Sequence, residues 1–182
     1  MNFKRLQIPD IILFEPIIFD DNRGYFTESY RKDKLDSFLG YSINFCQENE
    51  SKSYYGVMRG LHYQTAPYAQ TKLVSVEYGI ILDVVVDLRK ESKTFGKHLE
   101  IELNAKNKKQ LLIPKGFAHG FIVLSDKATV SYKLDEYYNP EFERGITYDD
   151  NDLGINWRIK NSDIKISEKD TKLPRFKDAE YF

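Results

Sequence analysis

Short hydrophobic runs separated by turn-forming residues recur along the chain. Runs in which apolar residues alternate or cluster lie at 11–14, 41–47, 72–76, 80–88, 98–103, 110–114, 120–124 and 129–134. Turn-forming residues stand between most of them, as at Gly79, Gly96, Asn104 and Asp126. Closely spaced strands with such turn signals are typical of an all-β sandwich or barrel. We therefore expect an all-β fold.

Two segments depart from this strand pattern. Residues 32–39 are predicted to form a short helix, and the tail after Trp157 is polar with scattered apolar positions. The tail is either a loose end or a strap folded over the barrel, and its aromatic ending and Pro174 favour the strap. No linker or repeat interrupts the 182 residues, a length that fits one domain.

Charge and cysteine content narrow the possible functions. The 27 basic and 28 acidic residues nearly cancel, so no basic field is available for a nucleic acid or an anionic membrane. No stretch approaches the roughly 20 apolar residues of a membrane span, and no long apolar signal segment is expected at the N-terminus. The single cysteine, Cys46, cannot form an internal disulfide, which favours the reducing cytoplasm. We expect Cys46 to be buried and inert.

The segment Arg59-Gly60-Leu61-His62-Tyr63-Gln64, followed by Lys72, is the strongest candidate for chemistry. We expect His62 and Lys72 to meet across two neighbouring strands in one pocket. Histidine is readily poised as a base at neutral pH. A fixed ammonium can stabilise the enolate that forms when a proton leaves carbon next to a ketone. Either residue alone has an alternative as a structural histidine or a solvated lysine.

The other candidates complete or compete with this pair. Tyr132 could donate a proton from the opposite face, whereas His119 either lines a barrel mouth or is structural, and His98 is expected at the surface. A metal site would need a second histidine close to His62, but Tyr63 and Gln64 follow it and the cation Lys72 comes next. We therefore expect no metal.

A second cluster, at residues 20–29, suggests anion recognition. Arg23 precedes Gly24, and the planar fork of arginine matches phosphate oxygens, with Arg59 as a second candidate. The alternative is a hairpin turn at residues 21–22 that carries a surface arginine.

Many ordered segments of the chain match one family pattern. They are residues 19–28, 47–49 with Ser51 and Ser53, 59–64, 69–74, 83–89, Ser92 with 94–96, 113–121, 132–133, 137–140 and 167–170. Over nearly its whole length the chain resembles the cupin-fold sugar-nucleotide 3,5-epimerases, the dTDP-4-dehydrorhamnose 3,5-epimerase family. The resemblance implies a double-stranded β-helix jelly-roll barrel with few short helices. It also implies an N-terminal arm at about 1–50, a barrel core at about 51–140 and an extended C-terminal strap at about 141–182.

The resemblance also implies roles for individual residues. His62 would be the base, held by Asp170, while Lys72 stabilises the enolate and Tyr132 returns a proton from the other face. His119 would line the pocket beside the sugar, with Asp83 as its orienting partner. The substrate-binding residues would be Arg23, Phe26, Glu28, Gln47, Asn49, Arg59, His119, Tyr138, Glu143 and Lys169. Arg144 and Glu141, beside Glu143, depart from the pattern and bear on the identity of the base.

The expected partners are a nucleotide-sugar substrate and a second copy of the chain. Family members are homodimers in which N-terminal strands exchange, so that the arm carrying Arg23 and Glu28 completes the neighbour's pocket. No cofactor is expected, because epimerisation involves no net oxidation. The resemblance favours conversion of dTDP-4-dehydro-6-deoxy-D-glucose to dTDP-4-dehydro-L-rhamnose.

Several alternatives to this reaction remain. The substrate could be another nucleotide-linked 4-keto deoxy sugar or a heptose. A 3,4-ketoisomerase should depart at the positions of Lys72 and Tyr132. A sugar-nucleotide-binding cupin without catalysis would need no base with an orienting carboxylate, and a metal-dependent cupin dioxygenase would contain a stoichiometric metal.

Overall fold

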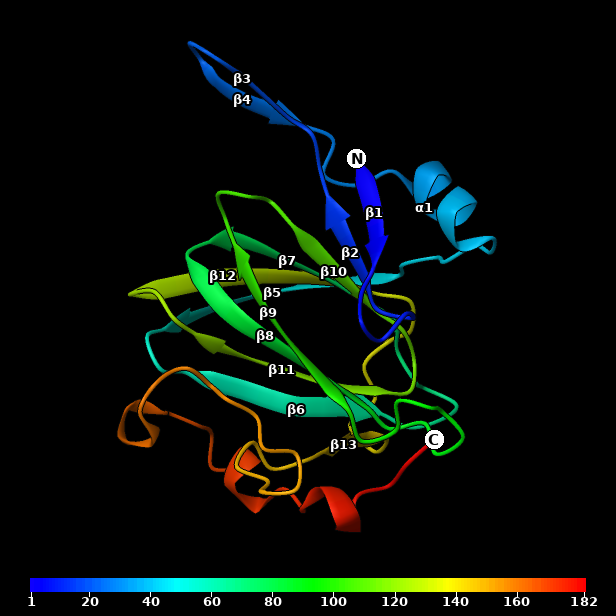
Figure 1. The fold of residues 1–182 in the computed structure, drawn as a ribbon, viewed down its shortest axis with the longest axis vertical. Helices are drawn as coiled ribbons and strands as arrows, with labels where there is room; N and C mark the ends of the chain where they lie inside the picture. Colours follow the sequence, from blue (N-terminus) through cyan, green and yellow to red (C-terminus); the bar gives the residue numbers. More distant parts are fainter.

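Two antiparallel sheets face one another to form a flattened barrel in the computed structural model, which describes all residues from 1 to 182 (Figure 1). The six-stranded sheet has the order β1 (Asn2–Arg5), β2 (Ile12–Glu15), β10 (Gln110–Ile113), β7 (Lys72–Tyr78), β12 (Lys127–Leu134) and β5 (Gln47–Tyr54). The five-stranded sheet has the order β13 (Glu143–Gly145), β6 (Met58–Gln64), β11 (Phe117–Val123), β8 (Ile80–Asp87) and β9 (His98–Asn104). The predicted all-β class and jelly-roll barrel are confirmed.

Alternating apolar residues close the space between the sheets. Val74 on β7, Val85 on β8, Phe121 on β11 and Val130 on β12 belong to one buried cluster that fills the barrel interior. On strands of this kind, successive side chains point to opposite faces, so the intervening residues cover the outside of each sheet. Any polar side chain that shares the inward positions therefore faces an apolar interior.

The N-terminal part of the chain contains a hairpin that projects from the barrel. Strands β3 (Ile18–Asp21) and β4 (Gly24–Thr27) pair only with each other and extend away from both sheets (Figure 1). The hairpin turn considered for residues 21–22 is present one residue further on, at Asn22 and Arg23 between the paired Asp21 and Gly24. Residues 2–15 of the expected arm instead form β1 and β2 of the six-stranded sheet.

The predicted helix at residues 32–39 is confirmed as α1 (Lys32–Leu39), which ends at Gly40 in the left-handed conformation. Leu35 on its buried face packs into a cluster on the outer face of the six-stranded sheet. No helix of this protein has the length and the apolar character needed to cross a membrane.

The C-terminal tail lies across the outer face of the five-stranded sheet, below β6 in Figure 1. It contains three short 3-10 turns, at Asn161–Asp163, Asp170–Lys172 and Phe176–Asp178. Trp157 and Leu153 are buried against Leu61 and Val84, which point outward from β6 and β8. Of the two alternatives for the tail, the structure has the packed strap.

The strand expected at residues 41–47 is wrong, because β5 begins at Gln47 and runs to Tyr54. This strand is polar throughout, so hydrophobic alternation could not reveal it. It lies at a sheet edge, where Asn49 and Ser51 line a polar cavity instead of an apolar core. The expectation of a buried cysteine is also wrong: Cys46, just before β5, is exposed.

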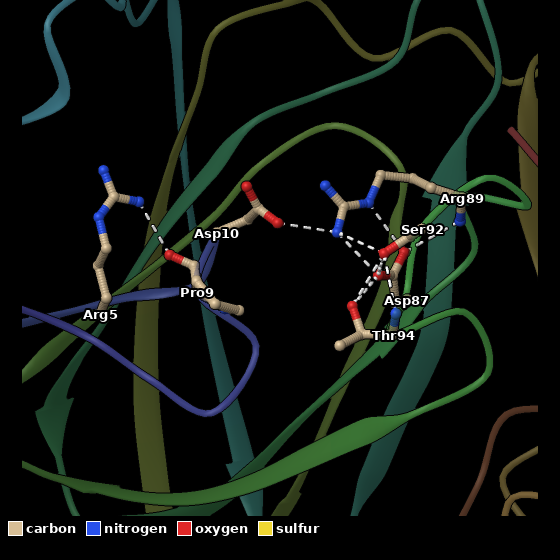
Figure 2. Close-up of polar contacts among 7 residues, drawn as sticks. All are labelled: Arg5, Pro9, Asp10, Asp87, Arg89, Ser92 and Thr94. Atoms are coloured by element: carbon tan, nitrogen blue, oxygen red, sulfur yellow. Dashed lines mark hydrogen bonds and ion pairs between the residues drawn. The ribbon is translucent and has the colours of Figure 1, made fainter.

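A polar network around Asp87 ties the β1–β2 connection to the β8–β9 connection (Figure 2). The fully buried Asp87 carboxylate accepts hydrogen bonds from Arg89, Ser92 and Thr94 at 2.6 to 2.9 Å. Arg89 also pairs with Asp10 in the β1–β2 connection, at 2.9 Å. Its guanidinium lies 4.4 Å from the ring centroid of Phe117 at the start of β11. The network thus fixes the strand that carries His119.

Candidate active site

A cavity of about 490 Å³ opens between β5 of one sheet and β6 of the other. Its volume lies in the range of small-molecule sites. The predicted residues that line it are His62, Lys72, His119, Tyr132, Glu143 and Asp170, together with Asn49, Arg59, Tyr138 and Lys169. Residues from both sheets and from the strap therefore converge on one cavity.

His62 is held by a carboxylate from the strap. Its Nε2 lies 2.7 Å from Oδ1 of Asp170, which begins a 3-10 turn and is buried. Burial alone would raise the pKa of Asp170, but the hydrogen bond and charge of His62 outweigh it and lower this pKa below its usual value. An ionised carboxylate on one ring nitrogen fixes the tautomer of a histidine and makes the other nitrogen more basic. His62 is therefore arranged as a base.

Two glycines let β6 and β11 approach closely beside His62 and His119. A Cβ on Gly60, whose φ is +123°, would lie 2.4 Å from the Cα of Gly120. Glycine adopts such a φ without strain and leaves room for the neighbouring backbone. The ladder pairs His119 with His62 and then shifts register, as at a β-bulge. Both imidazoles are thereby brought to the same part of the cavity.

His119 has its own carboxylate partner. Its Nε2 lies 2.9 Å from Oδ2 of Asp83, a residue of β8 that is fully buried. The site therefore has two histidine–carboxylate pairs, one made with the strap and one made within the barrel. His98 is instead half-buried on β9, where its Nε2 lies 3.4 Å from Glu100 Oε1.

Lys72 reaches the cavity from the opposite sheet. Its Nζ donates a hydrogen bond to the carbonyl oxygen of His62 at 3.3 Å. Burial lowers the pKa of Lys72 to about 8, although the negative charges of Asp83 and Glu143 oppose this shift. The expectation that His62 and Lys72 lie on neighbouring strands is wrong, because β6 and β7 belong to facing sheets. The segment between them crosses from one sheet to the other.

Tyr132 lies on β12, next to β7, and points into the barrel. It pairs in register with Val74 and packs partly against the interior cluster. Its side chain lines the same cavity as His62, and its hydroxyl forms no hydrogen bond within the protein. A phenol with a free hydroxyl can donate a proton into the cavity.

Three side chains, Tyr138, Glu143 and Lys169, form a charged cluster at the outer rim of the cavity. Glu143 on β13 accepts a hydrogen bond from the Tyr138 hydroxyl at 2.6 Å and pairs with the ammonium of Lys169. The hydrogen bond from Tyr138 to this carboxylate is the main reason why the pKa of Tyr138 rises to about 12. Burial alone would raise the pKa of Glu143, but the bonds from Lys169 and Tyr138 hold it below its usual value. Tyr138 itself is exposed and free on its ring faces to receive a planar group.

Further polar residues extend along β5 and β6. The Gln47 amide donates to Asn49 at 2.9 Å and accepts from the backbone of Tyr138 at 3.1 Å. Arg59 is exposed, and its Nε donates to Ser53 at 3.0 Å. Arg59 and Lys169 are therefore cations at the rim that can approach a ligand.

The hairpin residues do not join this site within one chain. Arg23 is 85% exposed on the β3–β4 hairpin and pairs with Asp21 at 2.6 Å. Phe26 is 67% exposed, and Glu28 pairs with Arg31 and Lys34. None of the predicted residues Arg23, Phe26 and Glu28 lines the cavity.

Arg144 and Glu141, the two departures from the family pattern, face away from the cavity. Arg144 pairs with Glu180 of the tail at 2.8 Å and donates to the carbonyl oxygen of Glu141. On a strand, neighbouring side chains point to opposite faces, so Arg144 points outward where Glu143 points inward. These departures do not alter the lining of the cavity.

Two residues that support the site, Gln64 and Ser167, were not predicted from the sequence. The buried Gln64 donates to the carbonyl oxygens of Tyr68 and Tyr137 and accepts from the backbone of Asn139 at 2.7 Å, which fixes the loop that carries Tyr138. Ser167 caps the turn at Asp170, whose backbone N–H donates to its hydroxyl at 3.1 Å. Both stand in the matched segments, but a sequence motif does not reveal which of its polar residues support another.

No group of three or more His, Cys, Asp or Glu side chains is arranged to hold a metal ion. The cavity instead offers an oriented base, an ammonium, a phenol and a cationic rim. This fold and site define a jelly-roll sugar-nucleotide epimerase. The family model of dTDP-4-dehydrorhamnose 3,5-epimerase matches residues 5–178, and the chain belongs to this isomerase family.

Individual relatives agree with this assignment. A dTDP-4-dehydrorhamnose 3,5-epimerase of Shigella flexneri is 48% identical over all of this chain and 99% of the relative. The crystal structure of the enzyme of that name from Elizabethkingia anophelis has a TM-score of 0.94, with 48% identity over 98% of this chain and 97% of the other. A Legionella pneumophila dTDP-6-deoxy-D-glucose-3,5-epimerase, in complex with dTDP-4-keto-L-rhamnose, has a TM-score of 0.89, with 42% identity over 96% of this chain and 98% of the other.

Proposed function

We propose that this protein converts dTDP-4-dehydro-6-deoxy-D-glucose to dTDP-4-dehydro-L-rhamnose by inverting carbons 5 and 3 of the sugar. The observation that carries the proposal is the His62–Asp170 pair at 2.7 Å, which shares one cavity with Lys72 and Tyr132. Family membership supports the same reaction. A protein that only binds a sugar nucleotide has no need of a base with an orienting carboxylate.

Each inversion consists of two proton transfers around the ketone at carbon 4. The free imidazole nitrogen of His62 removes the proton from carbon 5, and the electrons of the C–H bond move to the carbonyl oxygen to form an enolate. The Lys72 ammonium stabilises this oxyanion as it forms. Tyr132 then donates its phenolic proton to the opposite face of carbon 5. His62 next releases its proton to solvent and Tyr132 takes one from solvent, after which the same sequence follows at carbon 3. General acid–base steps of this kind typically contribute about 10²- to 10⁴-fold each.

The rim supplies the contacts proposed for the nucleotide. The exposed ring of Tyr138 suits stacking on the base, while Arg59 and Lys169 are placed to meet the diphosphate. Lys169 is paired with Glu143, so the diphosphate would compete with this carboxylate for the ammonium. Asn49 and Gln47, which are linked to each other and to the backbone of Tyr138, would position the nucleoside.

We further propose a homodimer in which the β3–β4 hairpins exchange. The hairpin exposes Phe19, Tyr25 and Phe26 at 57, 55 and 67%, a set of aromatic residues that a monomer would leave in water. Exchange would bring Arg23, Phe26 and Glu28 to the partner's cavity and add an arginine for the diphosphate. The proposed reaction needs no cofactor, and the single cysteine favours the cytoplasm as its location.

The decisive experiment is incubation with dTDP-4-dehydro-6-deoxyglucose in deuterium oxide, followed by proton NMR. We expect the proton signals of carbons 5 and 3 to disappear, with or without a chelator. In His62→Ala both proton signals should persist. The Tyr137→Ala variant, which changes an exposed residue, serves as a matched control and should exchange both protons at the normal rate.

The remaining outcomes separate the alternatives. Exchange only with a GDP- or CDP-linked 4-keto sugar would retain the chemistry and reject the dTDP assignment. Tight binding without exchange of either proton would contradict catalysis and favour a binding protein. Loss of exchange in chelator, restored by a metal, would contradict the metal-free reaction.

A further inference from the structure

Asp83 has a buried carboxylate oxygen that accepts no hydrogen bond. The residue points into the barrel between Ile81 and Val85 of β8 and is fully buried. Its Oδ2 bonds to His119, whereas its Oδ1 is equally buried and has no hydrogen-bond partner. A buried charge without compensation is costly. A favourable interaction with a nearby positive charge would offset this cost.

Lys72 is a nearby cation whose ammonium group also has donors without hydrogen-bond partners. An ammonium has three N–H donors, yet Lys72 makes one hydrogen bond, at 3.3 Å, to the carbonyl oxygen of His62. Burial favours its neutral form and lowers its pKa to about 8. Two carboxylates act against this shift, Asp83 more strongly than Glu143.

The geometry brings Lys72 and Asp83 to the same pair of residues. His62 and His119 are partners in the β6–β11 ladder. Lys72 contacts the backbone of His62 from the opposite sheet, while Asp83 contacts the ring of His119 from β8. The two charges therefore flank one short stretch of backbone across the interior of the barrel.

The other charged groups around Lys72 already have partners. Asp170 of the strap bonds to His62, and Glu143 of β13 pairs with Lys169 and accepts from Tyr138. The titratable groups that face Lys72 from the remaining elements are His62, His119 and Tyr132. Of the three carboxylates near the cavity, Asp83 alone has a buried oxygen with no hydrogen-bond partner.

We propose that Asp83 is a positioning residue with two tasks: its Oδ2 orients His119, and its charge keeps Lys72 in the ammonium form. This inference rests on the proposed function, in which the ammonium stabilises the enolate. A neutral amine would offer the oxyanion only a weak hydrogen bond in place of a charge. Asp83 would thus act on the reaction through Lys72 without touching the substrate.

The experiment measures the pKa of Lys72 directly. The protein is labelled biosynthetically with lysine carrying ¹³C at Cε, and the ligand-free protein is titrated by NMR, with Lys72→Arg identifying the resonance. We expect Lys72 to titrate near 8 in the unaltered protein. In Asp83→Asn, which keeps the shape and removes the charge, we expect a value lower by about one unit, because an opposite charge that favours the ammonium form is lost.

A matched variant separates charge from orientation. His119→Gln removes the partner of Asp83 and keeps the Asp83 carboxylate, so the pKa of Lys72 should stay near 8. An unchanged pKa in Asp83→Asn would overturn the proposal, as would an equal fall in both variants. If Asp83→Asn does not fold, Asp83→Thr takes its place under the same criteria, because a β-branched side chain suits a strand.

A kinetic readout tests the consequence for catalysis. The basic limb of kcat/KM should move to lower pH in Asp83→Asn by the shift that NMR records for Lys72. A limb that stays in place while the Lys72 resonance moves would overturn the catalytic role of the charge. Since the titration uses no substrate, a lowered Lys72 pKa in a protein without epimerase activity would reject the proposed function and leave the charge interaction standing.

Discussion

Tyr132 differs from the other three groups of the proposed reaction because no hydrogen bond holds its hydroxyl. Tyr132→Phe removes the returning proton and leaves His62 and Lys72 in place. We therefore expect inversion at carbon 5 to fall by about 10²-fold or more, while exchange of the carbon 5 proton with solvent falls much less. Deuterium incorporation and product configuration, followed in the same NMR experiment, give both rates. An equal fall in the two would contradict this division of roles.

Residue chemistry was predictable from the sequence to the extent that it depends on residue type. His62 and Lys72 stand out as a base and a cation, but the sequence between them does not reveal that the chain crosses to the facing sheet. Asp170 lies 108 positions from His62, a separation that no local pattern can bridge. Only the family resemblance indicated that pair.

Among the elements, the strap connects packing to catalysis. Trp157 anchors the strap because it is buried against the five-stranded sheet, and its indole N–H donates to the carbonyl oxygen of Tyr148 at 2.8 Å. Trp157→Ala should lower the free energy of unfolding by about 3 kcal/mol or more, as other buried tryptophans do. It should also reduce kcat, because the strap carries Asp170. Urea unfolding and steady-state kinetics measure the two effects, with the exposed Tyr137→Ala as a control.

A particular result would separate the two effects. If Trp157→Ala lost stability but kept full kcat under folding conditions, the position of Asp170 would not depend on this packing. The β-bridge between Val57 and Lys165, which joins the β5–β6 connection to the strap, would then better explain how Asp170 is held in position.

Strands differ in how visible they are in the sequence. The buried strand β8 is apolar except at Asp83 and Asp87 and was found, and so was α1, which ends at Gly40. Strand β5 was misplaced because Gln47–Tyr54 contains no apolar alternation: its inward side chains face the polar cavity. The elements that build the site are thus the hardest to predict from hydrophobicity, because they expose polar groups to a ligand.

At the scale of the whole molecule, the Asp87 network joins the β1–β2 connection to the β8–β9 connection (Figure 2). Arg89 of this network also contacts Phe117 at the start of β11. Burial alone would raise the pKa of Asp87, but hydrogen bonds from Arg89 and Thr94 outweigh it and lower the pKa from 3.8 to about 2. A carboxyl group whose pKa is lower in the folded than in the unfolded protein stabilises the fold at a pH above its unfolded pKa. This contribution is lost as the pH falls through the folded pKa. The difference between the two pKa values of Asp87 corresponds to about 2 kcal/mol of unfolding free energy.

Asp87→Asn should therefore cost at least about 2 kcal/mol of unfolding free energy at pH 7. The gap between the variant and the unaltered protein should narrow as the pH falls from about 4 towards 2. Urea titrations at several pH values measure it, and the exposed Asp126→Asn should show little effect at any of them. A gap that is constant with pH would mean that the loss comes from packing and geometry and not from the ionised carboxylate.

The proposed exchange of hairpins makes two inactive proteins complementary. In an Arg23→Ala homodimer every site would lack the arginine of the arm, and in a His62→Ala homodimer every site would lack its base. A mixed dimer has one site that combines His62 from the first chain with the arm of the second. If the two proteins are unfolded together and refolded in equal amounts, half of the dimers are mixed. Activity should then return to about a quarter of the normal value per chain. A hairpin that serves the cavity of its own chain would leave Arg23 and His62 in the same site, so the mixture would stay as inactive as its components.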